Sequence, residues 1–233
     1  MKLKDKVVII AGASEGIGRA TALRLAAEGA KLAIAARTRA KLETLAEEIR
    51  AMGQEVLIIP TDMTNPEQAN TLIKETVAAF GRVDILVNNI GRGLRKPFVE
   101  TTDEEWQRLV AENLSTTIYG CRAVLPQMED QREGLIINMA SRSGRVGEAN
   151  LAAYSAVKHG VIGLTKALAA EEGGKGVRVN AICPGPVRTE RMDKLLPNAD
   201  KSNWLTPEDV AAAVLFMVTS PGRTMQGQAL EMF

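Results

Sequence analysis

The sequence predicts a three-layer α/β fold, in which a doubly wound parallel sheet of about seven strands lies between two layers of helices. Short apolar runs without polar alternation recur along the chain, which is typical of strands buried on both faces. The segments between these runs repeat apolar residues at helical spacing. Strands that alternate with helices form right-handed βαβ units, and these units build a parallel sheet.

The predicted strands are apolar runs that occupy residues 7–11, 32–36, 56–60, 84–88, 135–139 and 177–182. Apolar residues at the helical period define two buried helix faces, one of Ile17, Ala20, Leu23 and Ala27 and one of Leu42, Leu45, Ile49 and Met52. Two helix starts are marked by capping residues, namely Thr102 with Glu105 and Thr206 followed by Pro207.

One long helix is predicted from Glu104 to Met128. Its buried stripe includes Trp106, Leu109, Val110, Thr117 and Cys121, and the polar Asn113 falls inside that stripe. A buried amide needs hydrogen-bond partners from another segment or from water. Asn113 is therefore either a structural residue bonded to a neighbouring carbonyl or part of a functional site.

Length and charge restrict the classes of function. The chain has 233 residues, which predicts a single domain over 1–233, with an irregular segment at 188–205 as a candidate lid. With 29 basic and 28 acidic residues, the net charge of +1 gives no general attraction to nucleic acid. No segment approaches the roughly 20 apolar residues of a membrane span. Cys121 and Cys183 match no metal spacing, so we expect no metal and a cytoplasmic protein.

A glycine-rich loop follows the first predicted strand and opens the first helix, with glycines at positions 12, 16 and 18. Glycines allow close backbone approach, and a helix N-terminus offers free N–H groups to a pyrophosphate. A tight strand-to-helix turn would also favour glycine. The second strand ends at Arg37 and Arg39, which suit the 2′-phosphate of NADP, although they are also compatible with solvated surface charges.

Tyr154 and Lys158 stand four residues apart, so on a helix they lie on the same side. An ammonium beside a phenol favours the phenolate and lowers its pKa from about 10. The hydroxyl of Ser141, arriving from a loop, could share a carbonyl oxygen with the tyrosine. Taken alone, such a pair is more often an ordinary helix start with a lysine whose stem packs on the surface.

The ordered motifs resemble the short-chain dehydrogenases/reductases, in the single-domain branch that includes the 3-oxoacyl-carrier-protein reductases. The resemblance runs from Lys6 to about Gly227 and rests on AGASEGIG (11–18), TDMT with Asp62, NNIG (88–91), Asn113, Ser141, YSAVK (154–158) and PGPVRT (184–189). It implies a Rossmann-like fold and an NAD(P)-dependent oxidoreductase that transfers hydride between nicotinamide and a carbonyl or secondary alcohol.

The resemblance also implies roles for single residues. Tyr154 would give and take the proton, Lys158 would lower its pKa and hold the nicotinamide ribose, and Ser141 would bind the substrate oxygen. Asn113 would hold a water that links Lys158 to solvent. The residues expected to bind the cofactor are Gly12, Ser14, Glu15, Gly16, Ile17, Gly18, Arg37, Asp62, Met63, Asn89, Gly91, Tyr154, Lys158, Pro184, Gly185, Val187 and Thr189.

The chain departs from the family pattern at several positions. Ala11 and Ile90 are small packing changes. Glu15 should repel a 2′-phosphate unless Arg37 or Arg39 pairs with it. Arg37 favours NADP(H), and because of Glu15 NAD(H) stays possible. The tail QGQALEMF lacks the aspartate-glycine-glycine ending of the family, so the last strand should be short.

Three further expectations concern assembly, the charges near the substrate and an alternative function. The resemblance suggests a homodimer or homotetramer that pairs the helices around Asn113 and Tyr154. Arg92, Arg95, Arg142 and Arg145 would lie with Glu148 near the substrate mouth, where they either attract an anionic substrate or are solvated rim charges. The alternative to an enzyme is a catalytically silent dinucleotide-binding regulatory or scaffold protein of the same fold.

Overall fold

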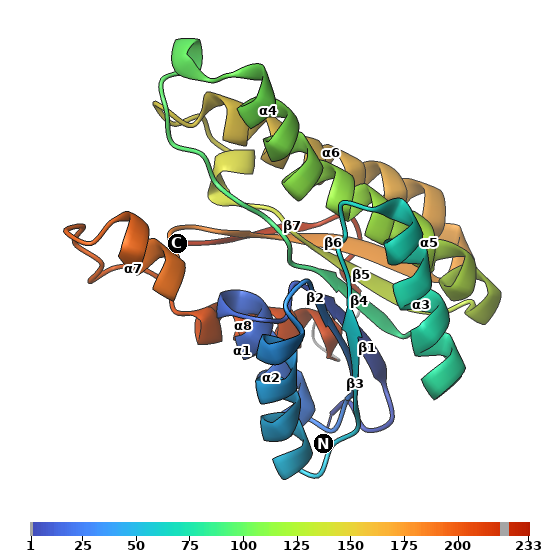
Figure 1. The fold of residues 1–233 in the computed structure, drawn as a ribbon. Helices are drawn as coiled ribbons and strands as arrows, with labels where there is room; N and C mark the ends of the chain where they lie inside the picture. The colour runs from blue at the N-terminus through green and yellow to red at the C-terminus, as the bar shows by residue number, and fades with distance from the viewer. Residues whose placement is uncertain (1, 220–223) are drawn as a thin grey trace.

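The strands form one parallel sheet, as the sequence predicts (Figure 1). The computed structural model describes residues 2–219 and 224–233. The spatial order of the sheet is β3-β2-β1-β4-β5-β6-β7. The strands are β1 Val7–Ala11, β2 Lys31–Ala36, β3 Val56–Pro60, β4 Ile85–Asn88, β5 Gly134–Met139, β6 Val177–Pro184 and β7 Ala229–Met232. The order reverses between β1 and β4, and in sheets of this kind ligands bind beyond the carboxyl ends of strands at that reversal.

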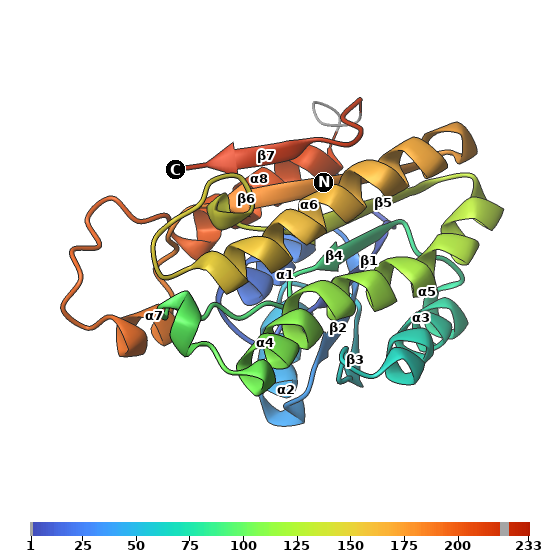
Figure 2. The same cartoon turned by 90° about the horizontal axis from the view of Figure 1, so that it is seen from above.

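Helices cover both faces of the sheet (Figures 1 and 2). They are α1 Gly16–Ala27, α2 Arg39–Ala51, α3 Pro66–Phe80, α4 Asp103–Leu109, α5 Thr116–Gln131, α6 Ala152–Glu172, α7 Glu190–Leu195 and α8 Pro207–Val218. Strand β1 divides its side chains between two core clusters. Val8 and Ile10 pack with α1, α2 and α8, whereas Ile9 and Ala11 pack with α3, α5 and α6. Alternate residues of a strand point to opposite faces, so one apolar run serves both layers.

The predicted strands and helix caps are confirmed. Each predicted strand is found to within two residues at either end, and the last strand is short. Thr102 with Glu105 and Thr206 with Asp209 both form complete capping boxes. These signals are local, so they do not depend on what the element packs against.

The predicted helix faces are partly wrong. The buried residues of α1 are Gly18, Ala20, Thr21, Ala22, Leu25 and Ala26 rather than the face through Leu23 and Ala27. Helix α1 packs on α8 as well as on the sheet, so its buried stripe is wider and turned relative to the apolar period. Met52 and Trp106 are 45% and 39% exposed, since each lies at the edge of its helix packing.

The predicted long helix is interrupted. Residues Val110–Ser115 form a π-helical turn between α4 and α5, and Asn113 is buried within it. A π-turn carries an extra residue and changes the direction in which side chains point, and such turns are frequent at functional sites. The interruption therefore decides where the Asn113 amide points.

A buried amide network joins β4, β5 and α6. The Asn88 Nδ2 donates to Asn138 Oδ1 at 2.9 Å, and the Asn138 Nδ2 donates to Thr165 Oγ1 at 3.0 Å. Asn138 and Thr165 are fully buried. Gly120 of α5 leaves room for this network, because a Cβ there would collide with Asn88 Oδ1. The network fixes the spacing of the two strands whose following loops carry site residues.

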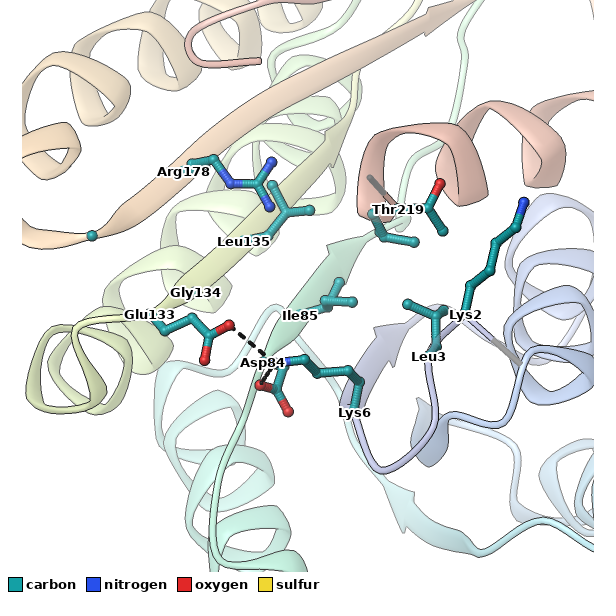
Figure 3. Close-up of a pocket in the computed structure, with 12 residues that line it drawn as sticks. Lys2, Leu3, Lys6, Asp84, Ile85, Glu133, Gly134, Leu135, Arg178 and Thr219 are labelled. Carbon is teal, nitrogen blue, oxygen red and sulfur yellow. Dashed lines mark hydrogen bonds and ion pairs between the residues drawn. The ribbon is translucent and has the colours of Figure 1, made fainter. Parts of the chain in front are cut away.

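The amino-terminal edge of the sheet is held by ion pairs around Asp84 (Figure 3). Its carboxylate accepts from Lys6 Nζ at 3.0 Å and from the Val7 N–H at 2.8 Å, and Glu133 binds the same lysine at 3.0 Å. A cavity of about 240 Å³ lies beside these groups. This edge is opposite to the carboxyl ends of the strands. Within the described ranges, none of the helices is both long and apolar enough to cross a membrane.

Gly120→Ala should lower the free energy of unfolding by about 1–3 kcal/mol, because the added methyl group displaces the Asn88 amide. In an Asn88→Ala background the colliding atom is gone, so the same change should cost less than about 1 kcal/mol. Urea unfolding of the four proteins of this cycle measures both costs. Equal costs in the two backgrounds would contradict the packing described.

Candidate active site

Loops at the carboxyl ends of β1, β4, β5 and β6 carry most of the predicted site residues. The glycine loop runs from β1 into α1, with positive φ at Gly12 (87°) and Gly16 (54°). These conformations favour glycine. Glu15 is the N-cap residue of α1 and makes no side-chain cap hydrogen bond. No side-chain cap from Glu15 therefore occupies the first N–H groups of α1, and the binding of a pyrophosphate there stays a prediction.

Neighbouring loops pack directly on the glycine loop. The Asn89 Nδ2 donates to the Gly12 carbonyl at 3.0 Å. A Cβ at Gly18 would collide with that carbonyl and the Asn89 amide, so Gly18 is required by protein packing alone. A Cβ at Gly16 would lie 3.2 Å from the Thr189 Cγ2. The loops after β1, β4 and β6 therefore meet, which brings Gly12, Asn89 and Thr189 together.

The charge of Glu15 is balanced by a residue that sequence reasoning missed. Lys41 Nζ lies 2.5 Å from Glu15 Oε2, whereas Arg39 pairs with Glu43 at 3.6 Å. Pairing with Arg37 or Arg39, the condition under which Glu15 would not repel a 2′-phosphate, is therefore not observed. Lys41 stands in the first turn of α2, and only the spatial approach of α2 to the glycine loop reveals it.

Two residues after β3 behave differently. Burial alone would raise the pKa of Asp62. The hydrogen bonds from Thr64 and the charge of Arg37 together have a larger effect in the opposite direction, so the pKa lies below its usual value. Arg37 and Asp62 are thus neighbours at the carboxyl edge. Met63 is 2% exposed, and its side chain packs in the core with Leu72. Only the backbone of Met63 could flank an adenine, since its side chain faces inward.

Lys158 is a buried ammonium. It is 2% exposed, and its Nζ donates to the Met139 carbonyl at 2.9 Å. A Cβ at Gly91 would lie 2.9 Å from this Nζ, so glycine makes the space for the lysine. Burial lowers the pKa of Lys158 to about 8.

Tyr154 lies beside this lysine at the start of α6. The Lys158 Nζ is 5.8 Å from the centre of the Tyr154 ring. Burial raises the pKa of Tyr154, while a hydrogen bond with the Ser141 side chain and the charge of Arg191 lower it by less. The expected lowering of this pKa by Lys158 is not observed: burial has the largest effect, and the groups that lower the pKa are Ser141 and Arg191. Ser141 and Tyr154 are nevertheless brought together as predicted.

The Asn113 side chain is fully bonded within the protein. Its Oδ1 accepts from the Arg92 N–H, and its Nδ2 donates to the carbonyls of Arg92 and Leu109, each at 3.0 Å. The Oδ1 lies 2.9 Å from the Cβ position of Gly91, as Lys158 Nζ does. The side chain therefore positions the loop over the lysine, and the water-holding role stays a prediction.

The two ends of the segment 188–205 lie side by side at the edge of the core. Val187 forms a parallel bridge with Leu205, and the Arg188 N–H donates to the Leu205 carbonyl at 2.7 Å. Val187 is 8% exposed and belongs to the core. Pro184 ends β6, and the Gly185 N–H donates to the Met232 carbonyl at 2.7 Å. The two ends of the segment are thus fixed, and α7 lies between them.

Lys158→Met tests the burial of this charge. The pKa of Lys158 is about 8 in the folded chain against 10.5 for the free side chain, so the unfolded chain binds more protons between these values. The stability lost to burial is recovered as pH rises through this window. We expect the free energy of unfolding of the wild type, relative to that of Lys158→Met, to rise by about 3 kcal/mol between about pH 7 and pH 11. Urea unfolding at a series of pH values measures this difference, and a difference that stays constant with pH would contradict the burial of the charge. Lys166→Met is the control, because Lys166 is exposed.

Comparisons with known proteins agree with this architecture. Residues 6–200 match the family model described as short chain dehydrogenase. An uncharacterized oxidoreductase of Staphylococcus aureus strain USA300 is 37% identical over 219 residues, covering 94% of this chain and 93% of that protein. The 3-oxoacyl-acyl-carrier-protein reductase of Synechocystis sp. is 37% identical over 227 residues, with 94% and 91% covered.

Solved structures of the same family have the same fold. The crystal structure of levodione reductase superposes with a TM-score of 0.92 at 32% identity, and the match covers 99% of this chain and 96% of that one. The sequence resemblance is thereby confirmed over nearly the whole chain. This protein belongs to the short-chain dehydrogenase/reductase family, whose members are oxidoreductases that use a nicotinamide dinucleotide.

Proposed function

We propose that the protein reduces a carbonyl substrate with a preference for NADPH, and that Tyr154 is its general acid and base. The observation that carries this proposal is the arrangement of Ser141, Tyr154 and the buried Lys158 beyond the carboxyl ends of the strands. A buried ammonium that pairs with no carboxylate is costly, so its retention indicates a function.

The residues present fit a dinucleotide. The uncapped N-terminus of α1 and the glycine loop would hold the pyrophosphate, Arg37 and Lys41 would hold a 2′-phosphate, and Lys158 would hold the nicotinamide ribose. The remaining cofactor contacts predicted from the sequence, including Asp62, Asn89, Gly91 and the turn from Pro184 to Thr189, would lie at the same edge of the sheet. A bound nicotinamide supplies the hydride.

The protein side chains would handle the proton. The raised pKa of Tyr154 keeps its phenol protonated at neutral pH, which suits donation to a carbonyl oxygen as its carbon is reduced. Ser141 would donate a hydrogen bond to the same oxygen and so stabilise the developing charge. In the reverse direction Tyr154 would accept the proton of the alcohol. Lys158 would then favour the phenolate that forms.

The substrate class and assembly are also proposals. We would assay 3-oxoacyl compounds first, because the Synechocystis relative is named as a 3-oxoacyl-acyl-carrier-protein reductase. The segment 188–205 would act as a lid over them. A homodimer or homotetramer would bury the exposed alanines of α6, which are Ala152, Ala156, Ala167 and Ala170. The buried free cysteines suit the reducing cytoplasm.

Tyr154→Phe should lower kcat by about 10²- to 10⁴-fold while NADPH binding is retained, because only the transferable proton is removed. Steady-state kinetics and NADPH fluorescence titration measure the two effects. Near wild-type turnover would reject the proposed mechanism. Tight NADPH binding by the unaltered protein without turnover of any ketone or alcohol would favour the silent scaffold instead.

Arg37→Ala and Lys41→Ala should each lower the ratio of kcat/KM with NADPH to that with NADH by about tenfold. The first removes a phosphate partner, and the second also leaves Glu15 unbalanced beside the phosphate. Arg39→Ala is the matched control, since Arg39 is exposed and pairs with Glu43. Equal use of both cofactors by the unaltered protein contradicts the preference.

Light scattering at micromolar concentration should give the mass of a dimer or tetramer. Ala156→Glu should shift this mass toward the monomer, because it places a charge on the exposed small face of α6. A monomeric mass for the unaltered protein would reject the proposed association.

A further inference from the structure

The segment 229–233, which comprises β7 and the residue after it, contacts two loops of the candidate active site. β7 lies at the edge of the sheet beside β6 (Figure 2). The register of this parallel pair places Glu231 opposite Cys183 and Met232 opposite Pro184, which ends β6. Residues 231–233 therefore lie at the carboxyl edge of the sheet, where the site residues are found.

The loop after β5, which carries Ser141, is bonded to this segment by two arginines. Arg145 Nε donates to Glu231 Oε1 at 2.6 Å. The Arg142 guanidinium carbon lies 5.6 Å from the centre of the Phe233 ring, a distance at which a cation is attracted to an aromatic face. Strand β6 separates β5 from β7, and neighbouring strands are about 4.8 Å apart. Long side chains are thus needed to join the loop to β7 across the end of β6.

The other side of this loop packs on α6, the helix that carries the reacting group. Ser143 and Gly144 are buried, and a Cβ at Gly144 would lie 2.7 Å from the Lys158 carbonyl oxygen. The Ser141 Oγ accepts from the Ser143 N–H at 3.2 Å, which fixes the serine within the turn. The turn is therefore held between α6 and β7. A shift of the turn would move the Ser141 hydroxyl relative to Tyr154.

The same segment contacts the loop after β6. The Gly185 N–H donates to the Met232 carbonyl at 2.7 Å. A Cβ at Gly185 would lie 3.2 Å from that oxygen and 3.7 Å from the Phe233 Cβ. Under the proposed function this loop would face the nicotinamide, whereas Ser141 would bind the substrate oxygen. The segment 229–233 thus joins the two groups whose separation sets the alignment of hydride donor and carbonyl.

Three of the four arginines predicted near the substrate mouth have partners within the protein. Arg95 and Arg142 lie 3.6 and 4.0 Å from Glu148, and Arg145 bonds to Glu231. The last two side chains are 38% and 34% exposed. Ion pairs this accessible to water contribute little to global stability. Removing the Arg145–Glu231 pair should therefore leave the fold intact while it releases the loop.

We propose that Arg145, Glu231 and Phe233 are positioning residues, which hold the Ser141 loop at the distance from the loop after β6 that the reaction requires. They act through Ser141 and do not touch the substrate. This inference rests on the proposed function, because it assigns the substrate oxygen to Ser141. It makes kcat, rather than cofactor affinity or fold stability, depend on the segment 229–233.

Charge reversal tests the ion pair. With NADPH and ethyl 3-oxobutanoate, an uncharged 3-oxoacyl compound, Arg145→Glu and Glu231→Arg should each lower kcat by about tenfold. The two changes combined should restore most of kcat, because the reversed pair can form again. The Kd for NADPH and the Tm should stay close to those of the unaltered protein. Lys31→Glu and Glu55→Lys are the matched controls, since that pair is also 2.6 Å long and lies at the amino-terminal edge of the sheet.

Two results of this experiment would overturn the proposal. If Arg145→Glu raises KM and leaves kcat unchanged, Arg145 binds the substrate and does not position the loop. If kcat falls only in proportion to the unfolded fraction, the ion pair serves stability alone.

A Ser141→Ala background shows whether the effect passes through the serine. In that background Arg145→Glu should lower kcat further by less than about twofold, since the group to be positioned is already absent. A second tenfold loss there would contradict the proposed route.

The ring of Phe233 is tested separately. Phe233→Ala should lower kcat by about threefold, and Phe233→Tyr should retain it, because an aromatic face would still meet the Arg142 guanidinium. Phe216→Ala is the control, since Phe216 is an exposed phenylalanine of α8. Equal kcat values for Phe233→Ala and the unaltered protein would remove Phe233 from the positioning residues.

Amide hydrogen exchange separates this proposal from the proposed function, because it needs no turnover. In the cofactor-free protein, Glu231→Arg should speed exchange in residues 140–146 by about threefold or more, and Glu55→Lys should not. If no carbonyl is reduced but this difference is found, the proposed function fails and the positioning of the loop stands. If Tyr154→Phe abolishes turnover while Arg145→Glu and Glu231→Arg leave kcat unchanged, the positioning role fails and the proposed function stands.

Discussion

The active-site region depends on the burial of one ammonium group. Lys158 loses its water almost completely and gains the Met139 carbonyl as an acceptor. Such a group is tolerated only where backbone dipoles are aimed at it and no side chain competes for its space. Gly91 provides that space beside the ammonium, whereas Gly144 allows close approach to the α6 backbone, where a Cβ would lie 2.7 Å from the Lys158 carbonyl oxygen. The loops after β4 and β5 are thus shaped around a charge that the fold alone does not need.

The sheet supplies the rigid frame for these loops. The strand order reverses between β1 and β4, so the glycine loop and the loop over Lys158 leave the sheet side by side. The Asn88 and Asn138 amides link β4 to β5 just before their loops begin. Polar groups bonded in this way have few alternative partners in a dry core, so they hold the strands in one register. The π-helical turn then carries the Asn113 amide to the Arg92 backbone.

The sequence predicts what is local and leaves out what depends on spatial neighbours. Buried parallel strands and capping boxes are encoded in a few consecutive residues, and they were correct to within two residues. The buried face of α1 was wrong because α8, distant in the sequence, widens it. Met63 and Lys41 could not be assigned from spacing, since the core position of one and the Glu15 contact of the other exist only in the folded chain. The raised pKa of Tyr154 likewise reflects burial, which the four-residue spacing to Lys158 does not report.

The π-helical turn has a consequence for changes in chain length. Because it holds one residue more than an α-helical turn, deletion of a single residue from Val110–Ser115 would let α4 and α5 join as a regular helix. The two halves would keep nearly the same relative phase, because the π-turn already takes up its extra residue locally. Chain length at this position therefore decides whether the Asn113 amide is displaced from a regular helical path toward the Arg92 backbone. An alignment gap here would change side-chain direction, whereas the same gap in a surface loop would only shorten a connection.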